Sequence, residues 1–269
     1  MRSKATVADK KQIKRVKYRL LTVSADAKTV KGESRGYLTA ILYMAPATEA
    51  DGVTNLCPYA TFGPGGCVEA CLGHEGRARL FKTVPAARVR RAKAYLADFE
   101  GFCTILETVD IPRFLRHAAE ANLIPVIRLN GTTDQWKLAR RIAAKFPTVQ
   151  FYDYTKIPQP WTRTMANYHL TFSFSGQNTA DCLEALAHGV NVAVVFQHHL
   201  PAAWHGYQVI NGDESDLRFL DAAGVVVGLK AKGLSKHRAV DGGFIQIQPA
   251  LPALRKLRRP APAVLPAAA

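Results

Sequence analysis

The chain has 269 residues, of which 48% are hydrophobic and 21% are charged. These values are typical of a globular protein, and the length suits one α/β barrel or two smaller domains. No apolar run approaches about 18 residues, so the sequence predicts no membrane-spanning helix. The N-terminus is basic but has no apolar segment behind it, which excludes a secretory signal there. We therefore expect a cytoplasmic protein whose cysteines stay reduced.

The positive charge is concentrated at the two ends of the chain. The formal net charge is +15 and the pI is about 9.8. Residues 1–36 carry eleven Lys and Arg side chains against three acidic ones, and 249–269 is basic and rich in Pro and Ala. We expect flexible basic arms on either side of a single α/β domain at 37–248. Such arms can bind the phosphates of DNA or RNA, although a merely solvated basic surface explains the charge equally well.

Between the expected arms, apolar segments alternate with helix-like segments. This alternation predicts a parallel sheet with helices on both faces, either in a barrel or in a doubly wound open sheet. No G-x-G-x-x-G motif follows a strand, which disfavours dinucleotide binding. The predicted strands are 37–47, 124–130, 148–155, 168–175, 190–197 and 224–233. The predicted helices, from Pro85 near the first start to Gly189 as the last C-cap, are 85–107, 110–123, 131–146 and 179–189.

Three of the five cysteines lie in one Gly- and Pro-rich loop at 55–79, directly after the first predicted strand. Cys57, Cys67 and Cys71 can ligate three irons of a 4Fe-4S cluster and leave the fourth iron open to a small molecule. Together with His74 they also form a Cys₃His set that suits a structural zinc ion. Three reduced thiols without a metal are the third interpretation. The remaining cysteines lie in predicted helices, where we expect small core side chains: Cys103 and Cys182.

Polar residues stand at the carboxyl ends of the predicted strands, where parallel α/β folds build their sites. After the second strand, Arg128 and Asp134 are placed to grip the carboxylate and amine of a ligand, or else to pair and fix the loop. Gly131 would let the backbone approach a ligand at the same point. The other candidates for cofactor binding at this edge are Asn130 and Ser173.

Two further strand-end residues are the candidates for catalysis. Asp153 is placed to act as an acid, a base or a ligand anchor if the alternation of its strand turns it inward. Lys230 would suit an anionic substrate or a phosphate if it faces the same edge. An outward orientation would leave either residue without such a role.

The sequence resembles a known family over about 37–247, in six segments that occur in the same order. The family is the bacteriophage "gene product 88" domain family, and the segments are "NLCPYATFGPGGCVEACLGHEGRARLFKTVPAARVRRAK", "VIRLNGTTD", "VQFYDYTK", "NYHLTFSFS", "VNVAVVF" and "DLRFLDAAGVVVGLKAKG". The resemblance implies a phage-type protein, which would act in the cytoplasm of the host cell. It implies little about function.

A more distant similarity is to radical S-adenosylmethionine enzymes, which carry three cluster cysteines in the loop after the first strand. It implies a partial (β/α)6 TIM-like barrel of parallel strands, a 4Fe-4S cluster on the three loop cysteines, and S-adenosylmethionine as a candidate cofactor. The spacing here is C-x₉-C-x₃-C, whereas the usual spacing is C-x₃-C-x₂-C.

Two functions from different classes are consistent with these features. The first is an iron–sulfur enzyme of radical S-adenosylmethionine type that acts on a nucleotide or nucleic acid. The second is a non-catalytic phage protein that binds nucleic acid or a host factor and holds a structural zinc ion. The polar residues at one edge of the sheet favour the first, because a pure binding module does not require them to converge.

Overall fold

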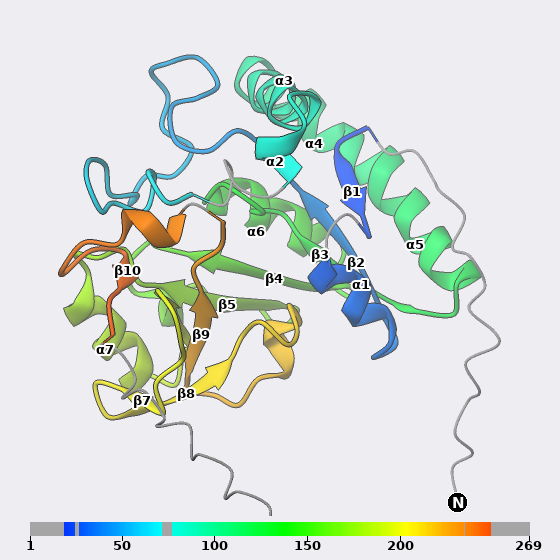
Figure 1. The fold of residues 1–269 in the computed structure, drawn as a ribbon. Helices are drawn as coiled ribbons and strands as arrows, with labels where there is room; N and C mark the ends of the chain where they lie inside the picture. Colours follow the sequence, from blue (N-terminus) through cyan, green and yellow to red (C-terminus); the bar gives the residue numbers. More distant parts are fainter. Residues whose placement is uncertain (1–18, 25–26, 72–76, 234, 249–269) are drawn as a thin grey trace, which may run out of the picture.

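The computed structural model describes residues 19–24, 27–71, 77–233 and 235–248. These residues form a mixed α/β fold around one large sheet (Figure 1). Its strands are β1 (Leu21–Val23), β2 (Tyr37–Leu42), β3 (Ile124–Arg128), β4 (Gln150–Thr155), β5 (Tyr168–Ser173), β6 (Val192–Phe196), β7 (Ala203–Trp204), β8 (Tyr207–Asn211), β9 (Val226–Lys230) and β10 (Ile245–Gln246). Six of them, β2 to β6 and β9, lie within the six predicted strand segments.

The strand order of the sheet is β1-β2-β3-β4-β5-β6-β9-β8-β7, and β10 pairs with the carboxyl end of β6. From β2 to β9 every pair along this path is parallel, as predicted. The path is not closed, because β8 and β7 extend the sheet beyond β9 and antiparallel β1 ends it beside β2. The partial TIM-like barrel expected from the sequence is therefore not confirmed. The α/β class with a mostly parallel sheet is confirmed.

Helices flank this sheet. They are α1 (Ala27–Glu33), α2 (Arg77–Leu80), α3 (Thr83–Ala97), α4 (Phe99–Ile105), α5 (Ile111–Glu120), α6 (Trp136–Lys145) and α7 (Thr179–Ala187). Short π or 3₁₀ turns occur at η2 (Leu106–Asp110), η3 (Pro160–Thr162), η4 (Arg218–Leu220) and η5 (Ser235–Arg238). In Figure 1, α3, α4 and α5 lie beside β1 and β2, and α7 lies at the opposite side of the fold. No helix in the described ranges is long and apolar enough to cross a membrane.

The long predicted helix at 85–107 is divided at Asp98. This residue has an extended backbone (φ −149°), and its carboxylate accepts the N–H of Gly101, so it caps the start of α4. The chain then continues through the π turn η2 into α5. Pro112 closely follows this π turn, and it cannot donate a backbone N–H to the turn before it.

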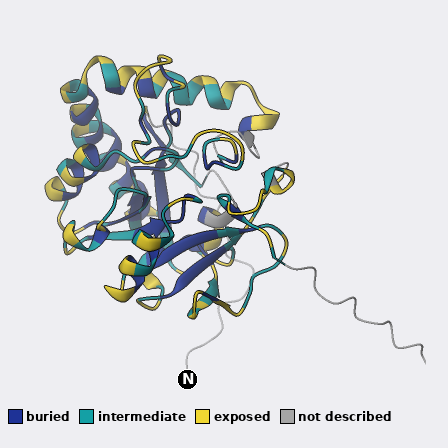
Figure 2. Ribbon diagram, turned by 90° about the vertical axis from the view of Figure 1, so that its left-hand side faces the viewer, coloured by how far each residue is buried: buried dark blue, intermediate teal, exposed yellow. Residues whose placement is uncertain are grey.

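The two faces of the sheet bury different kinds of residue. On one face, Leu38 and Ile127 belong to the main hydrophobic core, which includes residues of α3 to α6. On the other face, Val126 and Tyr152 pack against Leu217 from the segment between β8 and β9. Figure 2 shows buried residues concentrated in the central strands and exposed ones on the outer helix surfaces. Successive side chains of a strand point to opposite faces of the sheet. In β3, for example, Ile127 therefore packs on the helix side and Val126 packs against the β8–β9 segment.

Part of the expected N-terminal arm belongs to the fold. Residues 19–24 and 27–36 include β1 and α1, and β1 pairs with β2. The buried carboxylate of Asp110 accepts the N–H of Leu20 (2.6 Å) and of Leu21 (2.9 Å), which fastens β1 beside α5. The rest of the two expected arms lies outside the described residues.

Candidate functional site

The cysteine loop lies across the carboxyl ends of the parallel strands. The thiol of Cys57 donates to the carbonyl of Thr132 after β3 (3.6 Å), and the hydroxyl of Thr61 donates to the carbonyl of Ser175 after β5 (2.8 Å). In Figure 1 the loop stands at the end of the sheet toward which β4 and β5 point. We call the region beneath it the strand-end pole and define it by the last residues of β3, β4 and β5 and the segments that follow them: 128–134, 153–157 and 173–178.

None of the five cysteines forms a disulfide, and the thiols of Cys57 and Cys67 contact backbone groups. The Sγ of Cys57 accepts the N–H of Ala47 at 3.4 Å, and the Sγ of Cys67 accepts the N–H of Thr61 at 3.3 Å. Burial raises the pKa of the Cys57 thiol to about 12, while the positive charge of Lys156 acts in the opposite direction. Cys57 is therefore a neutral thiol at pH 7 in this conformation.

The described residues contain no assembled metal site. Within 19–24, 27–71, 77–233 and 235–248, no group of three His, Cys, Asp or Glu side chains is arranged to hold a metal ion. His74, the fourth member of the considered zinc set, lies outside these ranges. The three loop cysteines therefore share a loop without converging on one point. The other two cysteines are buried in α4 and α7, as predicted: Cys103 and Cys182.

Asp153, the expected acid or base, is buried and surrounded by hydrogen-bond donors. Its carboxylate accepts the backbone N–H of Leu129 (3.3 Å) and of Asn130 (2.9 Å). It also accepts the side-chain amide of Asn130 and the hydroxyl of Tyr168. Burial raises the pKa of Asp153 to about 6, and the charge of Arg128, 3.9 Å away, acts against this rise. In this conformation the carboxylate holds the turn after β3.

Arg128 pairs with an aspartate from the β8–β9 segment and not with Asp134. Its Nη1 lies 2.9 Å from Oδ2 of Asp216, and the hydroxyl of Tyr152 donates to the same oxygen at 3.1 Å. The guanidinium also lies 4.9 Å from the ring centroid of Tyr154. Arg128 thus fastens the β8–β9 segment to the sheet, and the ligand clamp considered from the sequence is not formed.

Asp134 and Asn130 shape the loop between β3 and α6. The Oδ2 of Asp134 accepts the N–H of Lys156 (2.7 Å) and the hydroxyl of Thr155 (3.1 Å), so it joins this loop to the end of β4. Burial raises the pKa of Asp134, and these two hydrogen bonds lower it. The Oδ1 of Asn130 accepts the N–H of Gln135 at the start of α6 (2.7 Å). Both residues lie at the strand-end pole with their oxygens engaged.

Ser173 and Lys230 complete the predicted set. Ser173 ends β5, and its carbonyl accepts the side-chain amide of Asn178 (3.1 Å). Lys230 ends β9 with an exposed side chain, and its N–H donates to Asp213 (2.9 Å). No hydrogen bond or ion pair between described residues joins Lys230 to the group around Asp153. The structure therefore brings most of the candidates to one pole and leaves Lys230 outside that group.

The sequence model of one family, gene product 88, matches residues 13–246. The chain belongs to the gene product 88 family. No curated protein and no solved structure gives a match. The family match extends over the whole strand-end pole and the three loop cysteines. It carries no stated activity, and the comparisons do not support the similarity to radical S-adenosylmethionine enzymes.

In this member of the gene product 88 family, Gly131 is required by close packing. A Cβ at this position would lie 2.6 Å from Cγ2 of Ile41 and 2.7 Å from Cδ1 of Tyr43. We expect G131A to lower the free energy of unfolding by about 1–3 kcal/mol, measured by urea denaturation, because side chains would have to shift. G32A is the matched control, since a Cβ at Gly32 meets nothing nearer than 3.6 Å. Equal losses in both variants would refute this explanation.

Two residues of this network were not anticipated from the sequence. Asp216 pairs with Arg128 across 88 positions, and Arg218 is buried beside Asp221 at 3.0 Å. Their segment, "DESDLRFLDAAG", is dense in charge, a pattern that ordinarily indicates a solvated surface. Four acidic residues around the single basic residue Arg218 were the only available signal, and they do not identify a distant partner.

Proposed function

We propose that this chain is an iron–sulfur enzyme whose 4Fe-4S cluster is held by Cys57, Cys67 and Cys71 above the strand-end pole. The observation that carries the proposal is the position of the cysteine loop, which is hydrogen-bonded to the segments after β3 and β5. Parallel α/β folds build their ligand sites at this end of the sheet. A cluster with three protein ligands keeps one iron open to a small molecule. The position of the loop and its three thiols thus both support a 4Fe-4S cluster with one iron open to a ligand.

Cluster binding requires the loop thiols to move together. Cys57 and Cys67 accept hydrogen bonds from the backbone of Ala47 and Thr61, contacts that a ligating thiolate can keep, because backbone N–H groups also donate to cluster sulfurs. A cation near a buried thiol favours the thiolate form, as the effect of Lys156 on the pKa of Cys57 illustrates. Because the ligating form is deprotonated, we expect cluster binding to be coupled to pH and to the ordering of the loop.

The proposed substrate is a nucleotide or a nucleic acid, met in the cytoplasm of the host cell. The support for this class is the net charge of +15, which attracts polyanions. S-adenosylmethionine is the first small molecule to test at the open iron. The strand-end residues of this chain would position such ligands, with Lys156 as the basic side chain that acts on Cys57.

The alternative is a non-catalytic nucleic-acid-binding protein with zinc in the cysteine loop. One observation favours it: the polar atoms of Asp153, Asp134 and Asn130 are engaged with other protein groups, as in a structural network. In that case the strand-end pole stabilises the fold, and the basic surface performs the binding. The identity of the bound metal separates the two functions.

The proposal is tested by a cysteine series reconstituted with iron and sulfide without oxygen. We expect C57A, C67A and C71A each to lose the absorbance near ~400 nm, because a cluster with only two protein ligands is not held stably. The matched controls, C103A and C182A, remove buried helical cysteines and should keep it. Retention of the absorbance in all three loop variants, or its loss in both controls, would contradict the assignment.

A further inference from the structure

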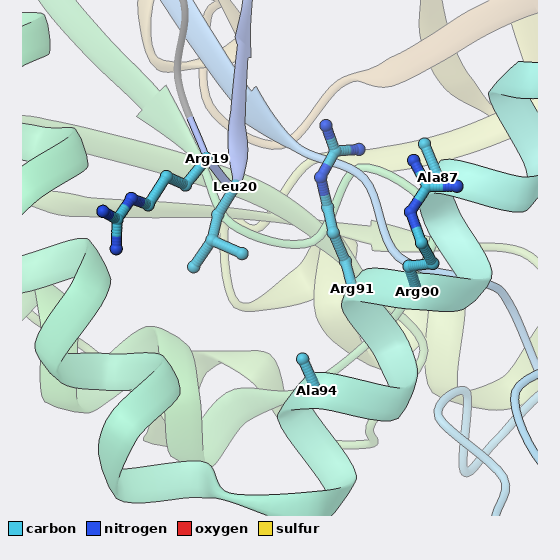
Figure 3. Close-up of a pocket in the computed structure, with 6 residues that line it drawn as sticks. All are labelled: Arg19, Leu20, Ala87, Arg90, Arg91 and Ala94. Carbon is cyan, nitrogen blue, oxygen red and sulfur yellow. The ribbon is translucent and has the colours of Figure 1, made fainter.

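A pocket of about 210 Å³ lies between α3 and the segment that leads into β1. Its walls are formed by three arginines and three apolar residues: Arg19, Leu20, Ala87, Arg90, Arg91 and Ala94. Figure 3 shows Arg90 and Arg91 extending from α3, with Arg19 and Leu20 contributed by the segment before β1. The pocket therefore joins two parts of the chain that are about seventy positions apart and concentrates their positive charge.

The charge of this pocket is not neutralised by its described surroundings. No ion pair between described residues includes Arg19, Arg90 or Arg91. The hydrogen bond recorded for Arg91 goes to the carbonyl of Tyr43 at 3.3 Å. The nearby carboxylate of Asp110 accepts three backbone N–H groups at the start of β1, although its charge still acts on Arg91. The three arginines that line the pocket thus have no carboxylate bound to them among the described residues, and Figure 3 shows Arg19 extending away from Arg90 and Arg91.

The positive charges around Arg91 repel one another. Burial lowers the pKa of Arg91, and the positive charges of Arg88 and Arg90 lower it further. Helix α3 contributes to this repulsion, since its sequence "TVPAARVRRAKAYLA" has four basic residues and no acidic one. An anion in the pocket would relieve the repulsion.

The geometry points to a phosphate of a nucleic-acid backbone as the occupant of this pocket, with the arginine-rich face of α3 as the docking surface. Arginine binds phosphate through paired N–H groups, and nucleic acids present a continuous row of phosphates.

A membrane surface fits the pocket less well. Peripheral membrane binding needs large apolar side chains beside the basic ones. The apolar lining here consists of two alanines and Leu20, which is 6% exposed. The pocket thus offers charge without an apolar anchor. The inference does not depend on the proposed metal, because none of the lining residues is a cysteine.

The test is fluorescence anisotropy with a labelled mixed-sequence duplex of about 20 base pairs, using the full chain over a range of salt concentrations. We expect R19Q/R90Q to bind roughly tenfold more weakly at ~100 mM salt. Its slope of log affinity against log salt should fall by about 2, one for each lost phosphate contact. The matched control is R140Q/K145Q, which removes the same charge from exposed positions on α6 and should leave the slope nearly unchanged.

Three results would overturn this inference. The first is R19Q/R90Q binding like the wild type, which would assign any binding to other basic residues, such as those in 1–18. The second is an equal loss in the α6 control, which would mean that net charge alone matters. The third is binding of the wild type to vesicles rich in phosphatidylserine but not to the duplex. Metal analysis of R19Q/R90Q separates this inference from the metal proposal, because this variant should lose duplex affinity and keep the metal content of the wild type.

Discussion

Replacing Asp153 by alanine should lower the free energy of unfolding by about 3–5 kcal/mol, because it removes the acceptor from a buried, charged network. The carboxylate accepts the N–H groups of Leu129 and Asn130, the amide of Asn130 and the hydroxyl of Tyr168. Without it, these buried donors lose their partner, and Arg128 loses one of its two carboxylates. The loss would be measured by urea denaturation at pH 7.

The control for this prediction is D98A. Asp98 also accepts a backbone N–H, that of Gly101, but it is exposed, so its removal should cost only about 1 kcal/mol. The pKa of Asp153 provides a second measurement. Since it is raised from 3.8 to about 6, protonation favours the folded state, and this stabilisation is present below about pH 4 and lost as the pH rises through 6. D153N should lack that pH dependence. A loss in D153A no larger than in D98A would show that the network is not stabilising.

Replacing Asp110 by alanine should release β1 from its contact with Asp110 and lower the free energy of unfolding by about 3 kcal/mol. Its carboxylate accepts the backbone N–H groups of Arg19, Leu20 and Leu21, and a buried donor left unpaired costs about 1–3 kcal/mol. Among the described strands β1 pairs only with β2, and its other support comes from the buried side chains of Leu20 and Leu21. Hydrogen exchange at the amides of Leu20 and Leu21 would report the release directly.

The matched control for D110A is D51A. Asp51 also accepts three hydrogen bonds, from the N–H groups of Val53 and Thr54 and from the Thr54 hydroxyl, but it is exposed at a loop. Water can replace those bonds, so D51A should cost much less. Unchanged exchange at Leu20 in D110A would show that β1 is held by other contacts.

The central strands could be predicted because they are largely apolar segments between turn residues, although β4 and β5 also carry polar side chains. "VNVAVVFQ", for example, contains β6, which is buried on both faces. The strands that were missed have two to five residues: β1, β7, β8 and β10. Their local sequences, such as "AW" and "IQ", are too short to show the alternation of apolar and polar residues that indicates a strand. They are strands because tertiary structure places a neighbouring edge beside them, which no local pattern contains.

The sequence indicated where the candidate residues lie along the strands, but not which hydrogen-bond and ion-pair partners they have. The strand-end rule correctly placed Asn130, Asp134 and Asp153 near the loop after β3. It could not show that Asp153 is enclosed by donors, because this depends on Tyr168 from the neighbouring strand. Nor could it reveal that Arg128 turns to Asp216, a partner 88 positions away. Gly131, considered for ligand approach, is explained by its packing against β2.

The iron–sulfur cluster proposed for the cysteine loop is tested most directly by metal and sulfide analysis of the wild-type chain, purified without oxygen from cells supplied with iron. We expect about four irons and a matching amount of acid-labile sulfide per chain. One zinc per chain with no iron would contradict it and would favour the non-catalytic alternative.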